Sequence, residues 1–156
     1  MKRLMLGSLL AFCLVVPMSA SGDPPTSDKA DGTVADLYPS ELHINAISDA
    51  DGSNARGHFY TRQSPNAPIL DEVGDVTCLN VSGNRATVGG RIDRSKLPGF
   101  PGEGSGMLFL VVDNGEPGDM DAWLGSFTGL PPTVCPPPGT YAFPHDHGNF
   151  VVQDAP

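Results

Sequence analysis

Basic side chains are scarce in this sequence. There are 9 Lys and Arg residues against 18 Asp and Glu, so the formal net charge is −9 at pH 7. The basic residues are scattered along the chain and form no cluster. A strongly acidic chain is repelled by nucleic acid and by anionic lipid surfaces, which excludes both as electrostatic partners. The charge balance is compatible with a well-solvated secreted surface or with cation binding.

Long apolar runs are scarce too, and the longest lies at the N-terminus. Lys2 and Arg3 precede an apolar stretch over Leu4–Val16, and small residues follow at positions 19–22. This order is typical of a secretory signal peptide, and the run is too short for an ordinary transmembrane helix. We therefore predict a signal peptide over residues 1–21, no transmembrane segment after its removal, and export to the periplasm, the envelope or the medium.

Cysteine is rare. The chain has three, and Cys13 lies within the predicted signal peptide. The remaining pair, Cys78 and Cys135, is predicted to form a disulfide, because an even number of cysteines in an exported chain is usually paired. Closing so long a loop would stabilise the fold by roughly 4 kcal/mol in the chain-entropy estimate. A redox or metal-binding pair is the alternative, but the C-x-x-C spacing typical of such sites is missing.

Helical signals are almost absent. With 19 Gly and 16 Pro, no window sustains an apolar repeat at helical spacing. Short strand-like segments recur instead, at residues 57–62, 75–81, 85–93, 107–112, 122–127 and 149–153. We predict an all-β fold of six to nine strands, a single antiparallel β-sandwich of the immunoglobulin-like or jelly-roll-like kind. Residues 22–34 are predicted to be a disordered polar leader, and residues 35–156 the single β-sandwich domain.

Local motifs refine this expectation. The most apolar run of the predicted domain, residues 107–112, is expected to be a buried strand, with Trp123 beside the same core. Ser82-Gly83-Asn84 predicts a tight hairpin turn. Gly89-Gly90 inside the second arm indicates a bulge or a close backbone approach.

Three motifs in this order resemble a family of small secreted bacterial β domains of unknown function. They are GDVTCLNVSGNRATVGGRI, LFLVVDNGEPGDMDAW and GNFVVQDA. The family pattern has a C-L-x-V-x-G-N-x-A-x-x-x-G hairpin, a V-x-D-N-G-E-P-G-x-x-D box and a closing G-N-x-x-V strand. The resemblance covers about residues 57–154 and implies a compact β domain without assigned catalytic residues. Many members have His near the final strand, where this chain has Gln153.

The segment Asp113–Asp121, here called the acidic turn, is the first candidate site. It offers five side chains with oxygen donors, which calcium prefers: Asp113, Asn114, Glu116, Asp119 and Asp121. It does not match an EF-hand, since Gly115 and Pro117 occupy ligand positions. The same residues fit a plain turn, in which aspartates cap free backbone amides. Calcium in the acidic turn is therefore one hypothesis beside a purely structural turn.

The second candidate is His145-Asp146-His147. Two histidines two residues apart on an extended segment lie on the same face, a spacing used by zinc and copper sites. A third ligand would have to come from His43, His58 or an aspartate. The alternative is an exposed loop bounded by Pro144 and Gly148. No nucleophile lies in a recognisable catalytic setting, since Ser105 lacks the G-x-S-x-G elbow, and we predict no catalytic residue.

Two function classes follow. The favoured one is an exported non-catalytic β-sandwich, monomeric, with a structural, adhesive or ligand-binding role at the cell surface or in the medium, with or without calcium in the acidic turn. The alternative is a secreted metal-dependent enzyme or metal carrier that uses His145 and His147 with zinc or copper. The sequence does not identify a ligand or a partner.

Overall fold

The computed structural model describes residues 26–35, 40–63, 71–96, 102–115, 121–145 and 147–156. These residues form nine strands: β1 (Ser27–Ala35), β2 (Ser40–Asp49), β3 (Arg56–Gln63), β4 (Asp71–Ser82), β5 (Arg85–Ser95), β6 (Gly106–Val112), β7 (Ala122–Thr128), β8 (Phe143–Pro144) and β9 (His147–Gln153). The described part of the chain contains no helix, so the predicted all-β class is confirmed.

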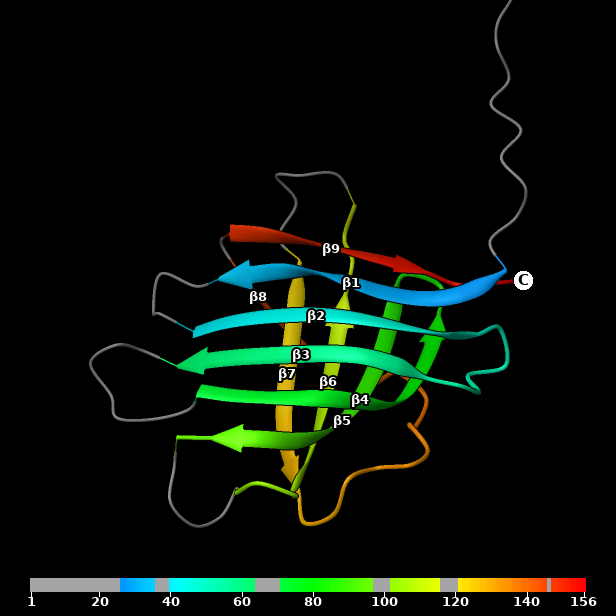
Figure 1. The fold of residues 1–156 in the computed structure, drawn as a ribbon. Helices are drawn as coiled ribbons and strands as arrows, with labels where there is room; N and C mark the ends of the chain where they lie inside the picture. The colour runs from blue at the N-terminus through cyan, green and yellow to red at the C-terminus, as the bar shows by residue number, and fades with distance from the viewer. Residues whose placement is uncertain (1–25, 36–39, 64–70, 97–101, 116–120, 146) are drawn as a thin grey trace, which may run out of the picture.

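The strands form one antiparallel sheet in the order β8-β7-β6-β5-β4-β3-β2-β1-β9. This sheet curls into a half-barrel. In Figure 1, β1, β2, β3 and β9 run across the view, whereas β6 and β7 run behind them at a steep angle. The sequence predicted two packed sheets, but the described strands are hydrogen-bonded into a single ladder. The two layers are the halves of one bent sheet, joined through β4 and β5.

The bend in β4 has a local cause. The register between β4 and β5 shifts between Val73 and Gly74, and again between Val76 and Cys78. A β-bulge adds a residue to one strand, bends it and reverses which face its later side chains occupy. Val76 therefore packs in the core together with Leu79, which an unbroken strand would place on opposite faces. The side chain of Cys78 consequently lies on the outer face of the sheet.

The core lies between the two halves of the sheet. The rings of Phe59 on β3 and Phe109 on β6 have centroids 5.1 Å apart, and both side chains are buried. Two glycines make room for Phe59: a Cβ at Gly74 or at Gly90 would lie 2.4 Å from its ring. A Cβ at Gly90 would also lie 2.7 Å from the backbone oxygen of Asp75, and the register shifts opposite Gly89-Gly90, so the close backbone approach and the bulge predicted there are both present. The predicted burial of residues 107–112 is confirmed for four of these six residues, Met107, Phe109, Val111 and Val112, whereas Leu108 and Leu110 are partly exposed.

Three strands were not among those predicted: β1, β2 and the two-residue β8. Residues 27–35, which the sequence placed in a polar leader, form β1 between β2 and β9. Ala30 and Val34 of β1 point into the core, and backbone bonds to two neighbours compensate for a segment with little apolar surface. In β2, Leu42, Ile44 and Ala46 alternate into the core. Figure 1 shows β1 and β2 within the curved sheet.

Candidate functional site

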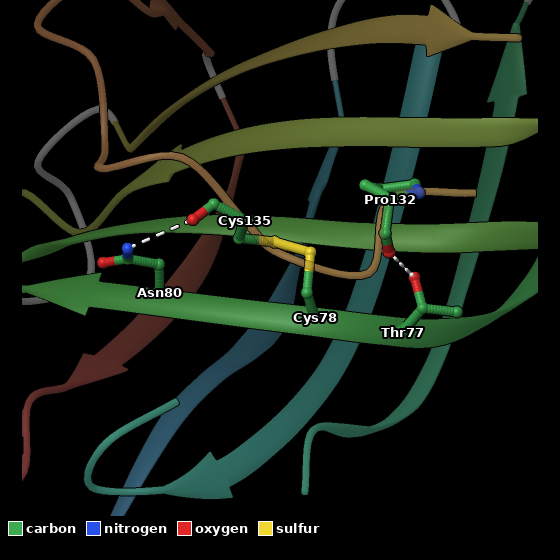
Figure 2. The surroundings of a disulfide bond; sticks show 5 residues. All are labelled: Thr77, Cys78, Asn80, Pro132 and Cys135. Atoms are coloured by element: carbon green, nitrogen blue, oxygen red, sulfur yellow. Dashed lines mark hydrogen bonds between the residues drawn. A yellow bond between two sulfur atoms is a disulfide. The ribbon is translucent and has the colours of Figure 1, made fainter. Parts of the chain in front are cut away.

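The disulfide predicted from the cysteine count is present. Cys78 on β4 and Cys135 are bonded, with their Cα atoms 5.4 Å apart and a separation of 57 positions in the chain. Cys135 belongs to residues 129–142, here called the outer segment, which contains no β-strand. As Figure 2 shows, β4 holds this segment at two further points. Thr77 Oγ1 donates to the carbonyl of Pro132 at 2.5 Å, and Asn80 Nδ2 donates to that of Cys135 at 3.3 Å. The disulfide thus ties a proline-rich connection to the sheet.

The absence of a side chain at Gly89 on β5 leaves room for this disulfide. A Cβ at this position would lie 2.5 Å from Cys78 Sγ, 3.1 Å from Cys135 Sγ and 2.6 Å from a ring carbon of Pro132. Any larger side chain would displace the bond or the outer segment. The two neighbouring glycines thus serve opposite faces of the sheet. Gly90 admits Phe59 on the inside, and Gly89 admits the disulfide on the outside.

A cavity of about 420 Å³ lies where the outer segment, β4 and the turn between β2 and β3 meet. Its volume falls within the range of small-ligand sites. The lining residues come from four parts of the chain: Asp28, Ala50–Ser53, Cys78–Val81 and Thr133–Cys135. The disulfide contributes directly to the wall, because both of its cysteines are among these residues. We call this cavity the disulfide pocket.

The charged residues that line the disulfide pocket are Asp28 and Asp51, both acidic. Asp28 is only 4 % exposed, and its Oδ1 accepts the backbone N–H of Ala155 at 2.9 Å. Burial raises the pKa of the Asp28 carboxyl, the Ala155 N–H partly offsets this, and the negative charges of Asp154 and Asp51 raise it further. Asp51 lies on the exposed turn and accepts the N–H of Ser53 at 2.9 Å. The pocket is therefore a locally electronegative site without a basic lining residue.

Neither aspartate of the disulfide pocket was among the predicted site residues. Asp28 lies in the segment predicted to be a polar leader, so its burial was not foreseen. Asp51 belongs to the sequence Ser48–Asn54, whose turn character is evident, but turn residues alone do not reveal a pocket. The usable signal was the Cys78–Cys135 pair. The disulfide between them brings residues 133–135 to the outer face of β4, and a crevice forms beside the bonded segment.

The acidic turn closes an open edge of the sheet. Asp121 Oδ2 accepts the backbone N–H of Phe150, and Asp113 Oδ2 accepts that of Val152 at 3.0 Å. Both amides lie on β9, whose other edge pairs with β1. An unpaired strand edge invites pairing with another chain, and here two carboxylates occupy its donors. The half-barrel is thus bridged by side chains where β6 and β7 face β9.

The other two oxygens of these carboxylates cap the turn itself. Asp121 Oδ1 accepts the N–H of Asn114, and Asp113 Oδ1 accepts the N–H of Gly115, each at 2.9 Å. All four carboxylate oxygens therefore accept a backbone amide, which is the structural role that the sequence offered as one alternative. Glu116 and Asp119, the other two carboxylates of the calcium hypothesis, lie outside the described residues. Calcium in the acidic turn stays a prediction.

The two predicted histidine ligands have different surroundings. His145 is 7 % exposed, and its ring stacks on that of Trp123 with centroids 5.4 Å apart. His147 is exposed at the start of β9, and Asp146 lies outside the described residues. His43 bonds to Thr33 and Glu41, and His58 lies 3.6 Å from Asp75. Within the described ranges, no three His, Cys, Asp or Glu side chains are grouped so as to hold a metal ion.

Comparison with protein-family models, with curated proteins and with solved structures gave no match to this chain. The resemblance to a family of small secreted bacterial β domains therefore stays a prediction. In the part of the chain that the structure describes, no helix has the length and apolar character needed to cross a membrane.

Proposed function

We propose that this chain is an exported, non-catalytic β domain that acts by binding a ligand at the cell surface or in the medium. The observation that carries the proposal is the Cys78–Cys135 disulfide, which fixes the outer segment on the sheet and forms part of a pocket wall. Such bonds persist in oxidising compartments outside the cytoplasm and are rare within it. Gly89 supports this view, since its lack of a side chain accommodates the bonded sulfurs.

A ligand-binding role is favoured over a purely structural one by the disulfide pocket. It combines a buried carboxylate with an apolar rim, and binding sites commonly place a few polar groups within an apolar surround. The acidic turn, by contrast, uses its described carboxylates to hold the fold together. Binding at the disulfide pocket is therefore separate from the residues that close the sheet.

The export part of the proposal is tested by expressing the full chain in its native host, fractionating the cells and alkylating the protein before and after reduction. We expect the protein outside the cytoplasm, lacking about residues 1–21, with Cys78 and Cys135 alkylated only after reduction. A full-length cytoplasmic protein whose cysteines react without reduction would contradict the proposal.

A further inference from the structure

We infer that the disulfide pocket binds a primary ammonium group carried on a short alkyl chain. This inference rests on the proposed function and specifies the chemistry of its ligand. It starts from the juxtaposition of Asp28 and Asp51 with the exposed apolar side chain of Val134 around one cavity of about 420 Å³.

The polar end of the pocket is a carboxylate with unused capacity. Asp28 is more than nine-tenths buried, and among the described residues its Oδ1 bonds to the Ala155 amide whereas its Oδ2 makes no hydrogen bond. The ionised carboxylate therefore keeps acceptor positions that the described residues do not use, and Asp28 is one of the residues that line the cavity. Burying a charge is costly unless it is paired, so a cation placed here recovers free energy that the empty pocket lacks.

Neighbouring charges select the sign of the ligand. Asp51 lines the same cavity, and Asp154 is close enough to raise the pKa of the Asp28 carboxyl. Among the described residues that line the pocket there is neither Lys nor Arg. An anionic ligand would be repelled by all three carboxylates, whereas a cation would relieve their mutual repulsion.

The rim favours an organic cation over a bare ion. Val134 is 81 % exposed and lines the cavity, and the Cys78–Cys135 disulfide forms apolar wall beside it, whereas the side chains of Leu79 and Val81 pack toward the core. An alkyl chain can lie along such a surface while its ammonium end reaches the buried carboxylate, as the stem of a lysine side chain does. A bare metal ion would need several converging ligands, and no such group of three is found among the described side chains.

The same chemistry has two sources, a free amine or a lysine side chain of another protein. Titrations of the oxidised protein followed by amide NMR separate them, with 1,5-diaminopentane and Nα-acetyl-lysine methylamide as probes and the uncharged 1,5-pentanediol as a control. We expect shifts at the amides of Ala155 and Ser53, which donate to the two aspartates. Binding of the diamine alone identifies a free amine, and binding of the lysine derivative identifies a protein partner.

Variants locate the binding. Asp28→Asn is expected to weaken probe affinity by roughly ten-fold or more, because it removes a buried charge from the contact. Asp51→Asn is expected to weaken it only about two- to five-fold, since an exposed ion pair contributes little. Asp75→Asn is the control: its carboxylate is exposed on β4 away from the pocket, and affinity should not change.

One further variant keeps the test decisive if Asp28→Asn does not fold. Val134→Lys alters an exposed residue and places an ammonium group at the rim, so it should abolish probe binding in a folded protein. The inference is overturned if the diol binds as well as the amines, if neither amine binds, or if binding survives Val134→Lys. If the protein is exported and oxidised but binds neither amine, only this inference fails. If the protein is found reduced in the cytoplasm, the proposed function fails.

Discussion

Replacing Asp121 by Asn tests whether carboxylates close the half-barrel. Asp121 is 2 % exposed and accepts two backbone amides, one from Asn114 and one from Phe150 on β9. Hydrogen bonds to a charged group contribute about 1.5–3 kcal/mol each, and an unsatisfied buried donor costs a similar amount. The Asn amide has one acceptor oxygen, so one of the two N–H groups would face its NH₂ group. We therefore expect Asp121→Asn to lower the free energy of unfolding by about 3 kcal/mol.

The matched control is Asp113→Asn. Asp113 also accepts two backbone amides, but its side chain is only partly buried, so water can replace a lost partner. Its expected cost is about 1 kcal/mol. Urea unfolding followed by the fluorescence of Trp123, the single tryptophan, measures both variants. A cost below about 1 kcal/mol for Asp121→Asn, or a larger cost for Asp113→Asn, would refute carboxylate closure of this edge.

Three further predictions follow from the structure. Burial raises the pKa of Glu72 above its ordinary value of 4.5, the bond from Ser95 partly offsets this, and Asp71 adds to it. A carboxyl whose pKa is higher in the folded than in the unfolded state stabilises the fold at pH values below its unfolded-state pKa, and this stabilisation is lost as the pH rises. Glu72→Gln should therefore raise the free energy of unfolding by about 1–2 kcal/mol at pH 7 and leave it unchanged below about pH 4. Urea unfolding measures both effects, with the exposed Glu103→Gln as the control. Gly89→Ala should cost about 1–3 kcal/mol and slow oxidative refolding, whereas Gly129→Ala, which meets no atom within 4 Å, should be neutral; equal effects would contradict the packing at Gly89. Excess calcium added after EDTA should leave the melting temperature unchanged if the acidic turn is purely structural, and a calcium-dependent rise lost in Asp119→Ala would establish the ion site instead.

Features encoded by neighbouring residues were predictable from the sequence. Most of the apolar run at 107–112 is buried in β6, and Gly83 has a φ of 58° in the hairpin turn between β4 and β5. The cysteine pair is bonded as predicted. Each of these depends on short-range patterns or on simple counting. The alternation of Leu42, Ile44 and Ala46 in β2 is equally local, and it could have predicted that strand.

Features that depend on distant parts of the chain were not predictable in the same way. The glycine pair Gly89-Gly90 indicated a bulge, and the register shift opposite it confirms one, but the sequence does not indicate that β4 carries the extra residue and that its later side chains change faces. The burial of Asp28 requires β1 to lie between β2 and β9, which its polar composition does not indicate. Likewise, Asp113 and Asp121 cap a strand about 30 to 40 residues further along the chain, so their structural role emerges only once the sheet has curled.

We propose that the disulfide-anchored outer segment forms a binding pocket in an exported protein. Calorimetric titration of 1,5-diaminopentane into the oxidised protein, and into the same protein with Cys78 and Cys135 reduced and alkylated, tests it most directly. We expect binding to the oxidised form and an affinity at least roughly ten-fold lower in the reduced form, because the wall of the pocket is then no longer anchored. Equal affinity in the two forms, or binding by neither, would contradict it.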